Sequence, residues 1–352
     1  MTEVMALPNW TEGNNYQSAL ARALQPEGFD IVYPAGYRRM FPLARAPFTS
    51  TALLHLHWPE AYFHRGAAWD GLRQLRFPLD LVLATRKRPL IYTAHNLLPH
   101  FPTWETITRA NYRLLLARAD GIIAHSTAAA KELAKFCPAA APAISVVPHG
   151  DPADGFPGLP DRAASRRALG LGLDTTEPVV LMFGRVEPYK GIQEIMAKWS
   201  EIHPTARLWI AGSTTDKGLA HELRALAASQ RRVTLELQWM SDEELAARFA
   251  ASDAVLFNYR RIFTSGAGCL ARSLGKKIIL PERLHTVDLM EPSPSVFRFK
   301  SIDEDLSRVL GAALKAADDP AGTEAWRKTT SWREVARQTA DVYRRALNAS
   351  AR

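Results

Sequence analysis

Short apolar runs alternate with helical patterns along the whole chain. In the first half, five such runs are each followed by a cluster of polar residues. This alternation is typical of βαβ units, which build parallel sheets covered by helices. We therefore predict a doubly wound α/β domain in the first half. Its predicted strands are Val4–Leu7, Ala52–Leu56, Leu90–Thr93, Gly121–Ala124 and Ile144–Val147.

The same alternation starts again after a stretch rich in Pro and Gly, which runs from Asp151 to Asp174. Such a stretch is typical of a linker, and its Arg-rich end predicts the opening helix of a second domain. An N-capped amphipathic helix is predicted from Ser331 to Ala346. The predicted strands of the second domain are Pro178–Phe183, Ala206–Ala211, Val233–Leu237, Ala254–Phe257 and Lys277–Leu280.

The length of the chain fits this division, because 352 residues exceed the ~100–200 residues of a usual domain. The predicted fold class is α/β, with two doubly wound, Rossmann-like domains that face each other across a central cleft. We set the two domains at residues 1–155 and 156–330, followed by a helical segment at 331–352.

Composition excludes several classes of protein. Hydrophobic residues make up 47% of the chain and charged residues 23%, as in ordinary globular proteins. No apolar run approaches the ~20 residues that span a bilayer, and no signal-peptide pattern is visible. The two cysteines, Cys137 and Cys269, stand in unrelated contexts. We therefore expect no disulfide framework and a cytoplasmic location.

The chain is basic, with 44 Lys and Arg against 36 Asp and Glu and a net charge of +8. Such an excess suits a nucleic acid, an anionic membrane surface or an anionic small substrate. The basic residues occur singly or in short groups such as residues 86–88, without interleaved aromatics and without zinc-finger spacing. Nucleic acid is therefore the least favoured partner.

Histidines gather at the predicted strand ends of the first domain. Of the five polar clusters that follow its strands, four contain histidine, namely His57, His95, His125 and His149. In open α/β sheets, ligands bind at the carboxyl ends of the strands. We therefore expect these clusters to form one wall of the cleft.

The segment FGRVEPYKG, residues 183–191, joins a predicted strand to a predicted helix. Gly184 lets a ligand approach the backbone closely, while Arg185 and Lys190 can direct positive charge at a diphosphate near a helix N-terminus. The alternative is a solvated basic turn. No Walker motif and no GxGxxG dinucleotide motif occurs in the chain.

A second segment, NYRRIFTSGAG at residues 258–268, also joins a predicted strand to a helix. Thr264, Ser265 and Gly266 would present hydroxyls and backbone N–H groups to a phosphate oxygen at the helix N-terminus. Simple N-capping by Thr264 or Ser265 is the alternative, and it does not exclude a phosphate. Two such segments in one domain favour a nucleoside diphosphate.

These motifs resemble those of GT-B glycosyltransferases. The resemblance is carried by GRVEPYKGI, YRRIFTSGAGCLARSLGKKII, the AHN after the strand Leu90–Thr93, and SWREVARQTADVYRRAL. It is greatest to a subgroup of bacterial exopolysaccharide assembly that shares strings similar to LHLHWPE and FGRVEPYKG and includes the xanthan-pathway β-mannosyltransferase. It extends from about Pro8 to Ala346.

The resemblance implies that the C-terminal domain binds a nucleotide sugar without a further cofactor and that the N-terminal domain binds the acceptor. It also implies that the last helix crosses back to pack on the N-terminal domain. The implied diphosphate contacts are Arg185, Lys190, Thr264, Ser265 and Gly266. The implied contacts to donor sugar or nucleotide are Gly184, Tyr259, Arg260, Arg261 and Trp239. The implied acceptor contacts are Trp10, Asn14, His57, Trp58 and Asn96.

One departure from the family concerns the mechanism. Many retaining GT-B enzymes carry a Glu-x7-Glu motif before a Gly-Lys pair. Aligned on Gly275 and Lys276, Ile262 and Leu270 stand where those glutamates would be. Neither offers a carboxylate to the donor, so we expect an inverting enzyme.

An inverting transfer needs a base that takes the proton from the acceptor hydroxyl. Glu60 is the first candidate, because it is the only carboxylate in its strand-end cluster. His95 is the second, since a neutral imidazole suits this role, and Glu12 is the third. Glu60 can instead cap the next helix, and His95 can instead bind the donor sugar.

We expect no metal site. The prediction is that His55 and His57 point to opposite faces of their strand and so do not form a ligand pair. No Asp-x-Asp occurs in the first domain either.

The stretch Trp69–Arg88 is apolar with basic flanks. It can rest on the cytoplasmic face of an anionic inner membrane, where a lipid-linked acceptor would be presented. The alternative is a pair of core helices kinked at Pro78.

The expected activity is transfer of a hexose to a polyprenyl-diphosphate-linked oligosaccharide in exopolysaccharide assembly. GDP-mannose with a β-linkage is the first expectation for the donor. The alternative is a UDP-glucuronate-dependent β-glucuronosyltransferase, in which Arg260, Arg261 and Arg272 would pair with the uronate. A non-catalytic sugar-nucleotide-binding protein is the alternative from another class.

Overall fold

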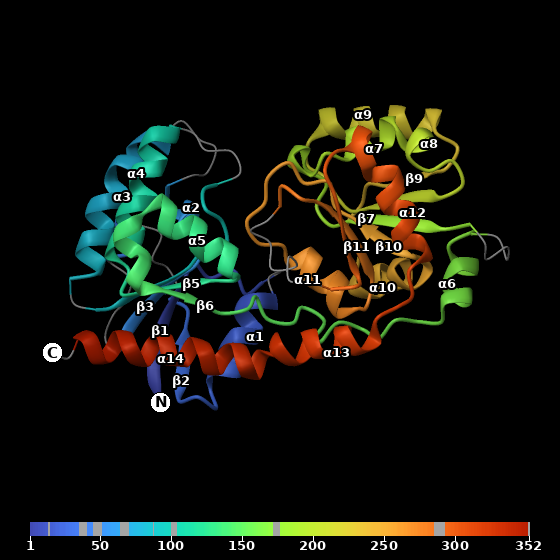
Figure 1. Ribbon diagram of the computed structural model, residues 1–352. Helices are drawn as coiled ribbons and strands as arrows, with labels where there is room; N and C mark the ends of the chain where they lie inside the picture. The colour runs from blue at the N-terminus through green and yellow to red at the C-terminus, as the bar shows by residue number, and fades with distance from the viewer. Residues whose placement is uncertain are drawn as a thin grey trace. The chain divides into compact units, whose positions relative to one another are not determined.

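The structure is a computed structural model that describes residues 1–12, 15–34, 41–44, 51–63, 70–86, 88–99, 104–171, 177–284 and 293–350. These residues form two compact units (Figure 1). The N-terminal unit comprises residues 1–150 and the segment from 329 onward, and the C-terminal unit the described residues between 151 and 328. The divisions fall at 150/151 and 328/329, against 155/156 and 330/331 in the prediction.

The N-terminal unit contains a sheet of six parallel strands in the order β2-β1-β3-β4-β5-β6. Its inner strands β3, β4 and β5 are buried throughout, as expected for a parallel sheet covered on both faces. The strands are β1 (Thr2–Leu7), β2 (Phe29–Val32), β3 (Leu53–Leu56), β4 (Leu90–Thr93), β5 (Gly121–Ala124) and β6 (Ile144–Val146). The helices are α1 (Asn15–Leu24), α2 (Glu60–Phe63), α3 (Asp70–Ala84), α4 (Glu105–Arg118), α5 (Thr127–Phe136) and α14 (Trp332–Ser350).

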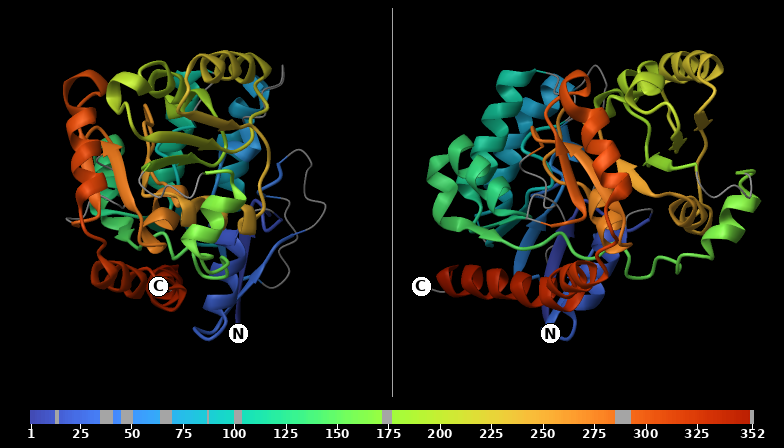
Figure 2. Two further views of the ribbon diagram at one scale, coloured as in Figure 1. Left: turned by 90° about the vertical axis from the view of Figure 1, so that its right-hand side faces the viewer. Right: turned by 45° about the vertical axis from the view of Figure 1, so that its right-hand side comes forward.

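The last helix, α14, packs on the N-terminal unit, which confirms the expectation of a crossover helix. Both views of Figure 2 show it lying alongside α1. Its buried face includes Trp332, Ala336 and Tyr343, which join Tyr16 and Val4 in one hydrophobic core. The aromatic residues of α14 therefore serve packing.

The C-terminal unit repeats the architecture, with six parallel strands in the order β12-β11-β10-β7-β8-β9. Two parallel-sheet domains confirm the predicted α/β fold class. The strands are β7 (Val179–Phe183), β8 (Arg207–Ala211), β9 (Val233–Glu236), β10 (Ala254–Leu256), β11 (Lys277–Pro281) and β12 (Val296–Phe299). The helices are α6 (Arg162–Ala168), α7 (Ile192–Ala197), α8 (Trp199–Ile202), α9 (Lys217–Ser229), α10 (Asp242–Ala251), α11 (Gly266–Ser273), α12 (Ser307–Lys315) and α13 (Pro320–Thr329).

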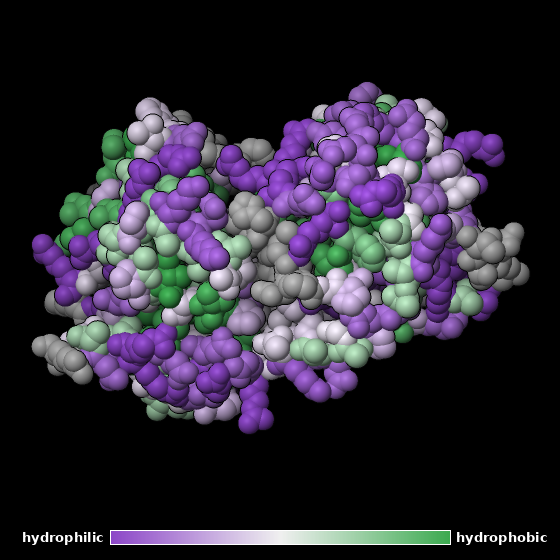
Figure 3. All heavy atoms as spheres, viewed as in Figure 1, coloured by the Kyte–Doolittle hydropathy of each residue, from purple (hydrophilic) through white to green (hydrophobic). Residues whose placement is uncertain are grey.

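The surface view shows where polar and apolar side chains gather. In Figure 3, polar side chains cover the upper part of the C-terminal unit, whereas hydrophobic side chains gather at the left margin of the N-terminal unit. Helices α3 and α4 lie at that margin in the matching view of Figure 1.

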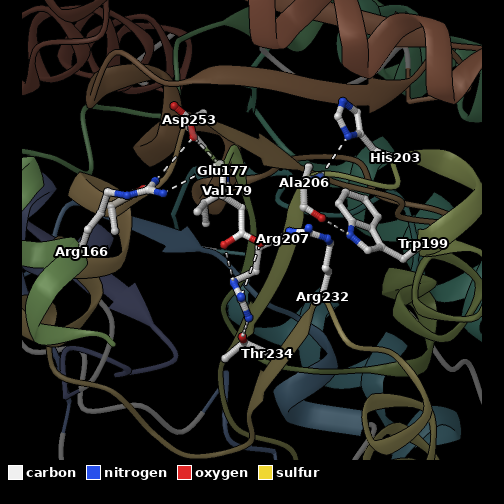
Figure 4. Close-up of polar contacts among 11 residues, drawn as sticks. Arg166, Glu177, Val179, Trp199, His203, Ala206, Arg207, Arg232, Thr234 and Asp253 are labelled. Carbon is white, nitrogen blue, oxygen red and sulfur yellow. Dashed lines mark hydrogen bonds and ion pairs between the residues drawn. The ribbon is translucent and has the colours of Figure 1, made fainter. Parts of the chain in front are cut away.

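Charged side chains hold the beginnings of the C-terminal strands together (Figure 4). The carboxylate of Glu177 accepts from Arg207, and its backbone carbonyl accepts from Arg166 Nη2 at 2.8 Å. Asp253, which precedes β10, accepts from the backbone N–H of Val179 at 2.8 Å. This network therefore occupies the edge of the sheet at which the strands begin, opposite the strand ends that carry the predicted motifs.

Each sheet has one point at which the strand order reverses. In the C-terminal sheet, β7 and β10 are neighbours although β8 and β9 separate them in sequence. In the N-terminal sheet, β1 lies between β2 and β3. Ligands of doubly wound proteins bind at the carboxyl ends of the strands at such switch points. The two predicted diphosphate segments follow β7 and β10, and Trp10 and Trp58 follow β1 and β3.

Candidate active site

The segment after β7 turns tightly and buries a lysine. Gly184 has a left-handed backbone (φ 82°), and a Cβ at this position would stand 3.2 Å from Lys190 Nζ. The ammonium of Lys190 donates to the carbonyl of Phe183 at 3.0 Å and lies 5.4 Å from the centre of the Tyr259 ring. Burial lowers the pKa of Lys190 to about 8, so the side chain is mostly charged at neutral pH. A buried cation beside a glycine turn is well suited to an anionic ligand.

The segment after β10 begins helix α11 with two hydroxyl residues. Ser265 Oγ accepts from the backbone N–H of Gly268 at 3.0 Å and so caps the helix. Thr264 Oγ1 is buried and has no hydrogen-bond partner among the described residues. Gly266 is the first residue of the helix. Ser265 therefore satisfies the helix end, whereas Thr264 keeps a hydroxyl available to a ligand.

The structure brings these two segments together. The backbone N–H of Arg260 donates to the carbonyl of Tyr189 at 2.7 Å. The amide of Asn258, which is fully buried, donates to the carbonyl of Gly191 at 2.9 Å and to Glu194 Oε2 at 3.1 Å. Gly191 has a left-handed backbone (φ 60°), and a Cβ there would stand 2.6 Å from the Asn258 amide nitrogen. Only a glycine fits this close approach.

The predicted arginines have different environments. Arg185 is exposed, and its Nη2 donates to Glu187 Oε1 at 2.9 Å. Arg260 is exposed and donates to Glu194 Oε1 through both Nε, at 3.1 Å, and Nη2, at 2.6 Å. Arg261 is exposed as well.

Two further residues predicted to contact the donor belong to this unit. Trp239 follows β9 and is 76% exposed, so its indole is accessible for stacking. Arg272 is buried, and its guanidinium lies 4.2 Å from the centre of the Trp326 ring. The position of Arg272 against Trp326 is that of a packing residue.

In the N-terminal unit, aromatic and histidine side chains stack at the switch point. The rings of Trp10 and Trp58 stack at 4.9 Å, and those of Trp58 and His95 at 4.2 Å. His57 Nδ1 lies 3.1 Å from His95 Nε2, within hydrogen-bond distance. Tyr16, on α1, contacts the edges of the His57 and His95 rings. Stacked indole rings at strand ends are suited to the apolar face of a sugar.

The prediction that His55 and His57 point to opposite faces was wrong. Their rings lie 4.1 Å apart, because residues two apart along a strand project from the same face. His55 is nevertheless engaged on both ring nitrogens: Nδ1 lies 2.6 Å from the Tyr343 hydroxyl and Nε2 lies 2.8 Å from Thr93 Oγ1. Its role is therefore structural.

Burial lowers the pKa of every histidine in this group. It lowers the pKa of His55 and His125 to about 3 and that of His149 to about 4. For His57 and His95 the pKa falls well below its usual value, chiefly through burial and then through neighbouring histidines. All five are neutral at pH 7.

Glu60 stands at the start of α2 and differs from the other base candidates. Its Oε2 accepts from the hydroxyl of Tyr112 at 3.0 Å, and burial raises its pKa above the usual range. Glu12 is exposed, Asn96 is half-buried, and Asn14 lies outside the described residues. Glu60 therefore combines a carboxylate with a raised pKa.

Several residues that form the site escaped sequence reasoning. Asn258 and Glu194 join the two diphosphate segments, Tyr16 holds the histidine group, and Tyr112 orients Glu60. Asn258 opens the second motif and offered a signal, because it is a polar residue directly after a buried strand. Tyr16, Tyr112 and Glu194 belong to helices and stand in no motif.

In the part of the chain that the structure describes, no three His, Cys, Asp or Glu side chains are grouped so as to hold a metal ion. Among the same residues, every helix is too short or too polar to cross a membrane.

Comparison with known proteins gives a family and relatives. The sequence profile of Glycosyltransferase Family 4 matches residues 19–152. GDP-mannose:glycolipid 4-beta-D-mannosyltransferase of Xanthomonas campestris pv. campestris is 24% identical over 72% of this chain and 68% of its own length. D-inositol 3-phosphate glycosyltransferase of Mycobacterium sp. strain KMS is 35% identical over 47% of this chain and 40% of its own length.

Solved structures share the fold over the whole chain. Sucrose-phosphate synthase from Thermosynechococcus elongatus superposes with a TM-score of 0.72 at 17% identity, covering 99% of this chain and 100% of that one. Anabaena HepE in complex with UDP-glucose superposes with a TM-score of 0.64 at 16% identity, covering 100% and 98%. The chain therefore has a GT-B fold, and the profile match over residues 19–152 together with the relatives indicates a glycosyltransferase enzyme.

Proposed function

We propose that the protein transfers mannose from GDP-mannose to a lipid-linked oligosaccharide with inversion, forming a β-linkage in exopolysaccharide assembly. The observation that carries the proposal is the switch point between β7 and β10, because the segment with Arg185 and Lys190 follows β7 and the segment with Thr264 follows its neighbour β10. The choice of donor and acceptor follows the Xanthomonas relative, whose name gives GDP-mannose and a glycolipid.

The diphosphate of the donor would bind at this switch point. Lys190 supplies a buried charge, and Arg185 supplies a second charge once the diphosphate competes with Glu187. The unpartnered hydroxyl of Thr264 donates to a phosphate oxygen beside the N-terminus of α11. Together these groups would stabilise the charge that develops on the leaving diphosphate.

Inversion requires a single displacement. The acceptor hydroxyl attacks the anomeric carbon of mannose on the face opposite the diphosphate, and its proton passes to the carboxylate of Glu60. The bond between the anomeric carbon and the diphosphate oxygen breaks, and its electron pair leaves with the diphosphate. The raised pKa of Glu60 makes it a stronger base than an ordinary carboxylate, whereas the lowered pKa of His95 makes it a weak one.

The acceptor would bind in the N-terminal unit. Trp10 and Trp58 offer stacked rings at the strand ends, and His57 offers a polar group beside them. We assign these three to the acceptor sugar.

The glucuronosyl alternative has less support. Three arginines were proposed to bind a uronate carboxylate. Arg260 already pairs with Glu194, and Arg272 packs against Trp326. Of the three, Arg261 is the exposed arginine without a described ion pair.

A thermal-shift panel of GDP, UDP, GDP-mannose, UDP-glucose and UDP-glucuronate tests the donor. A ligand at ~100 times its dissociation constant stabilises the fold by about 2.7 kcal/mol. We expect a response confined to the guanine nucleotides. A response largest for UDP-glucuronate would replace the mannosyl proposal, and no response to any nucleotide would remove the diphosphate assignment.

The variant Arg185→Ala tests the diphosphate site through its transfer activity and its melting temperature. We expect transfer to fall by about 10²–10³-fold while the melting temperature without ligand is unchanged, because the arginine is exposed and acts on developing charge. Arg224→Ala, an exposed arginine on α9, is the matched control. Full activity in Arg185→Ala would contradict the assignment.

The anomeric configuration of the product, read by NMR, tests inversion.

A further inference from the structure

Helix α3 has two different faces. One face is buried and the other carries leucines that point to solvent. The buried positions are Asp70, Gln74, Phe77, Asp80, Leu81 and Ala84. The exposed leucines are Leu72, Leu75, Leu79 and Leu83. Both sets recur at intervals of three and four residues, so each occupies one side of the helix.

Contacts on the buried face fix the orientation of the helix. The Phe77 ring meets the Phe63 ring edge-on at 4.9 Å. Gln74 accepts from Thr108 Oγ1 at 2.9 Å through its side chain and from the Asn111 amide at 3.0 Å through its backbone carbonyl. The leucine face therefore cannot turn inward without breaking these contacts.

The leucine face is strongly exposed. Leu72, Leu75 and Leu79 are 63%, 66% and 52% exposed. Trp104, itself 63% exposed, extends this face, because its indole lies beside Gly71, where a Cβ would stand 3.4 Å from the indole ring. We call Leu72, Leu75, Leu79, Leu83 and Trp104 the α3 surface. Helix α3 lies at the left margin of the N-terminal unit in Figure 1, where hydrophobic side chains gather in the matching view of Figure 3.

The charges around the α3 surface are asymmetric. The helix carries two carboxylates, and both are buried: Asp70 pairs with Arg73 at 3.1 Å, and Asp80 accepts from the backbone N–H groups of Leu43 and Ala44. Arg86, just past the helix end, is exposed. The exposed charge on the described part of this helix is therefore positive. Next to Trp104, the exposed Glu105 pairs with Arg109 at 3.0 Å.

We propose that the α3 surface docks the protein on an anionic lipid bilayer, with the leucines in the interface, Trp104 at the level of the headgroups and Arg86 against lipid phosphates. An apolar helix face bordered by basic residues and an exposed Trp matches that environment. A second copy of the chain fits less well, because pairing two such faces would bring the arginines of both copies together. This inference rests on the proposed function, since docking would bring the enzyme to a lipid-linked acceptor.

Co-sedimentation with vesicles tests the surface. The full chain is mixed with vesicles of phosphatidylglycerol and phosphatidylcholine, and with vesicles of phosphatidylcholine alone. We expect binding to the anionic vesicles that weakens as salt is added. The double variant Leu75→Glu, Leu79→Glu should bind about a hundredfold more weakly, because each leucine moved out of water contributes about tenfold.

Two further variants complete the test. Leu159→Glu changes an exposed leucine of the C-terminal unit and is the matched control, with unchanged vesicle binding. Arg86→Glu should weaken binding to anionic vesicles about tenfold at low salt. Equal binding by the wild type and the Leu75→Glu, Leu79→Glu variant would overturn the proposal. Sedimentation velocity gives a second outcome that would overturn the proposal: the wild type is a dimer and the Leu75→Glu, Leu79→Glu variant is a monomer.

Transfer assays distinguish a failure of the docking proposal from a failure of the proposed function. Transfer to a water-soluble acceptor analogue should be equal in the wild type and in the Leu75→Glu, Leu79→Glu variant, because the change lies outside the proposed donor and acceptor residues. Transfer to a soluble acceptor without vesicle binding overturns the docking surface alone. Vesicle binding without a response to any sugar nucleotide overturns the proposed function alone.

Discussion

Thr264 and Ser265 are neighbours at the start of α11, yet their hydroxyls differ in hydrogen bonding. Ser265 caps the helix through Gly268, whereas Thr264 Oγ1 is buried without a partner. A buried polar group without a hydrogen bond costs free energy, and a ligand can supply the missing partner. Thr264 therefore marks the position at which we expect a phosphate oxygen.

Replacing the two hydroxyls should separate ligand binding from helix capping. In Thr264→Val, the affinity for the donor nucleotide should fall about tenfold, while the free energy of unfolding stays the same or rises slightly. In Ser265→Ala, the free energy of unfolding should fall by about 1 kcal/mol, because the N-cap is lost. Calorimetric titration and urea unfolding of both variants provide the measurements. Unchanged donor affinity in Thr264→Val would remove this residue from the site.

At the level of elements, the loops after β7 and β10 form one unit because Asn258 joins them. Its amide reaches the carbonyl of Gly191 and the carboxylate of Glu194, and Arg260 adds two hydrogen bonds to the same carboxylate. Arg283 also donates to Asn258 Oδ1, at 3.1 Å. The positions of the two diphosphate segments are thereby coupled.

The variant Asn258→Ala should uncouple the loops. It leaves the Gly191 carbonyl without this donor, so the free energy of unfolding should fall by about 1–3 kcal/mol. The KM for the donor should rise more than kcat falls, because Asn258 positions the site and does not touch the reacting atoms. Asn348→Ala, on the exposed side of α14, is the control. If stability falls while KM is unchanged, Asn258 has only a structural role.

The inner strands were predictable from sequence, whereas two edge strands were not. The strands β3, β4, β5 and β7 are fully buried apolar runs, which is the pattern that sequence analysis detects. Strand β2 contains Asp30 and strand β12 contains Arg298, and both lie at the edges of their sheets. A half-buried edge strand tolerates charge, so its apolar run is too short to recognise.

Part of the candidate site was likewise predictable from sequence, and part was not. Lys190, Thr264 and Ser265 stand in contiguous segments next to predicted strands, so their motifs were readable. The bond between Asn258 and Gly191 depends on β7 and β10 being neighbours, which the order of the strands in sequence does not reveal. The orientation of α3 is likewise a tertiary property, because its apolar positions allow either face to be buried.

At the level of the whole molecule, the histidines of the N-terminal unit make the free energy of unfolding depend on pH. Five histidines lie in one group, four of them buried and His149 half-buried, and desolvation lowers the pKa of each. In the unfolded chain a histidine titrates near about 6.5. Below that pH the unfolded chain binds protons that the folded chain does not bind, so the free energy of unfolding decreases as the pH falls. Glu60 and Asp80 oppose this trend, because their pKa values are raised in the fold.

We therefore expect urea unfolding to show lower stability at about pH 5 than at about pH 7, since each such histidine contributes up to about 1.4 kcal/mol per pH unit. The effect should end near the folded pKa values, about 4 for His149 and about 3 for His55. His149→Gln should reduce the slope by about one proton, because it removes one titrating group. A stability independent of pH over this range would mean that the histidines are accessible to protons in the folded protein.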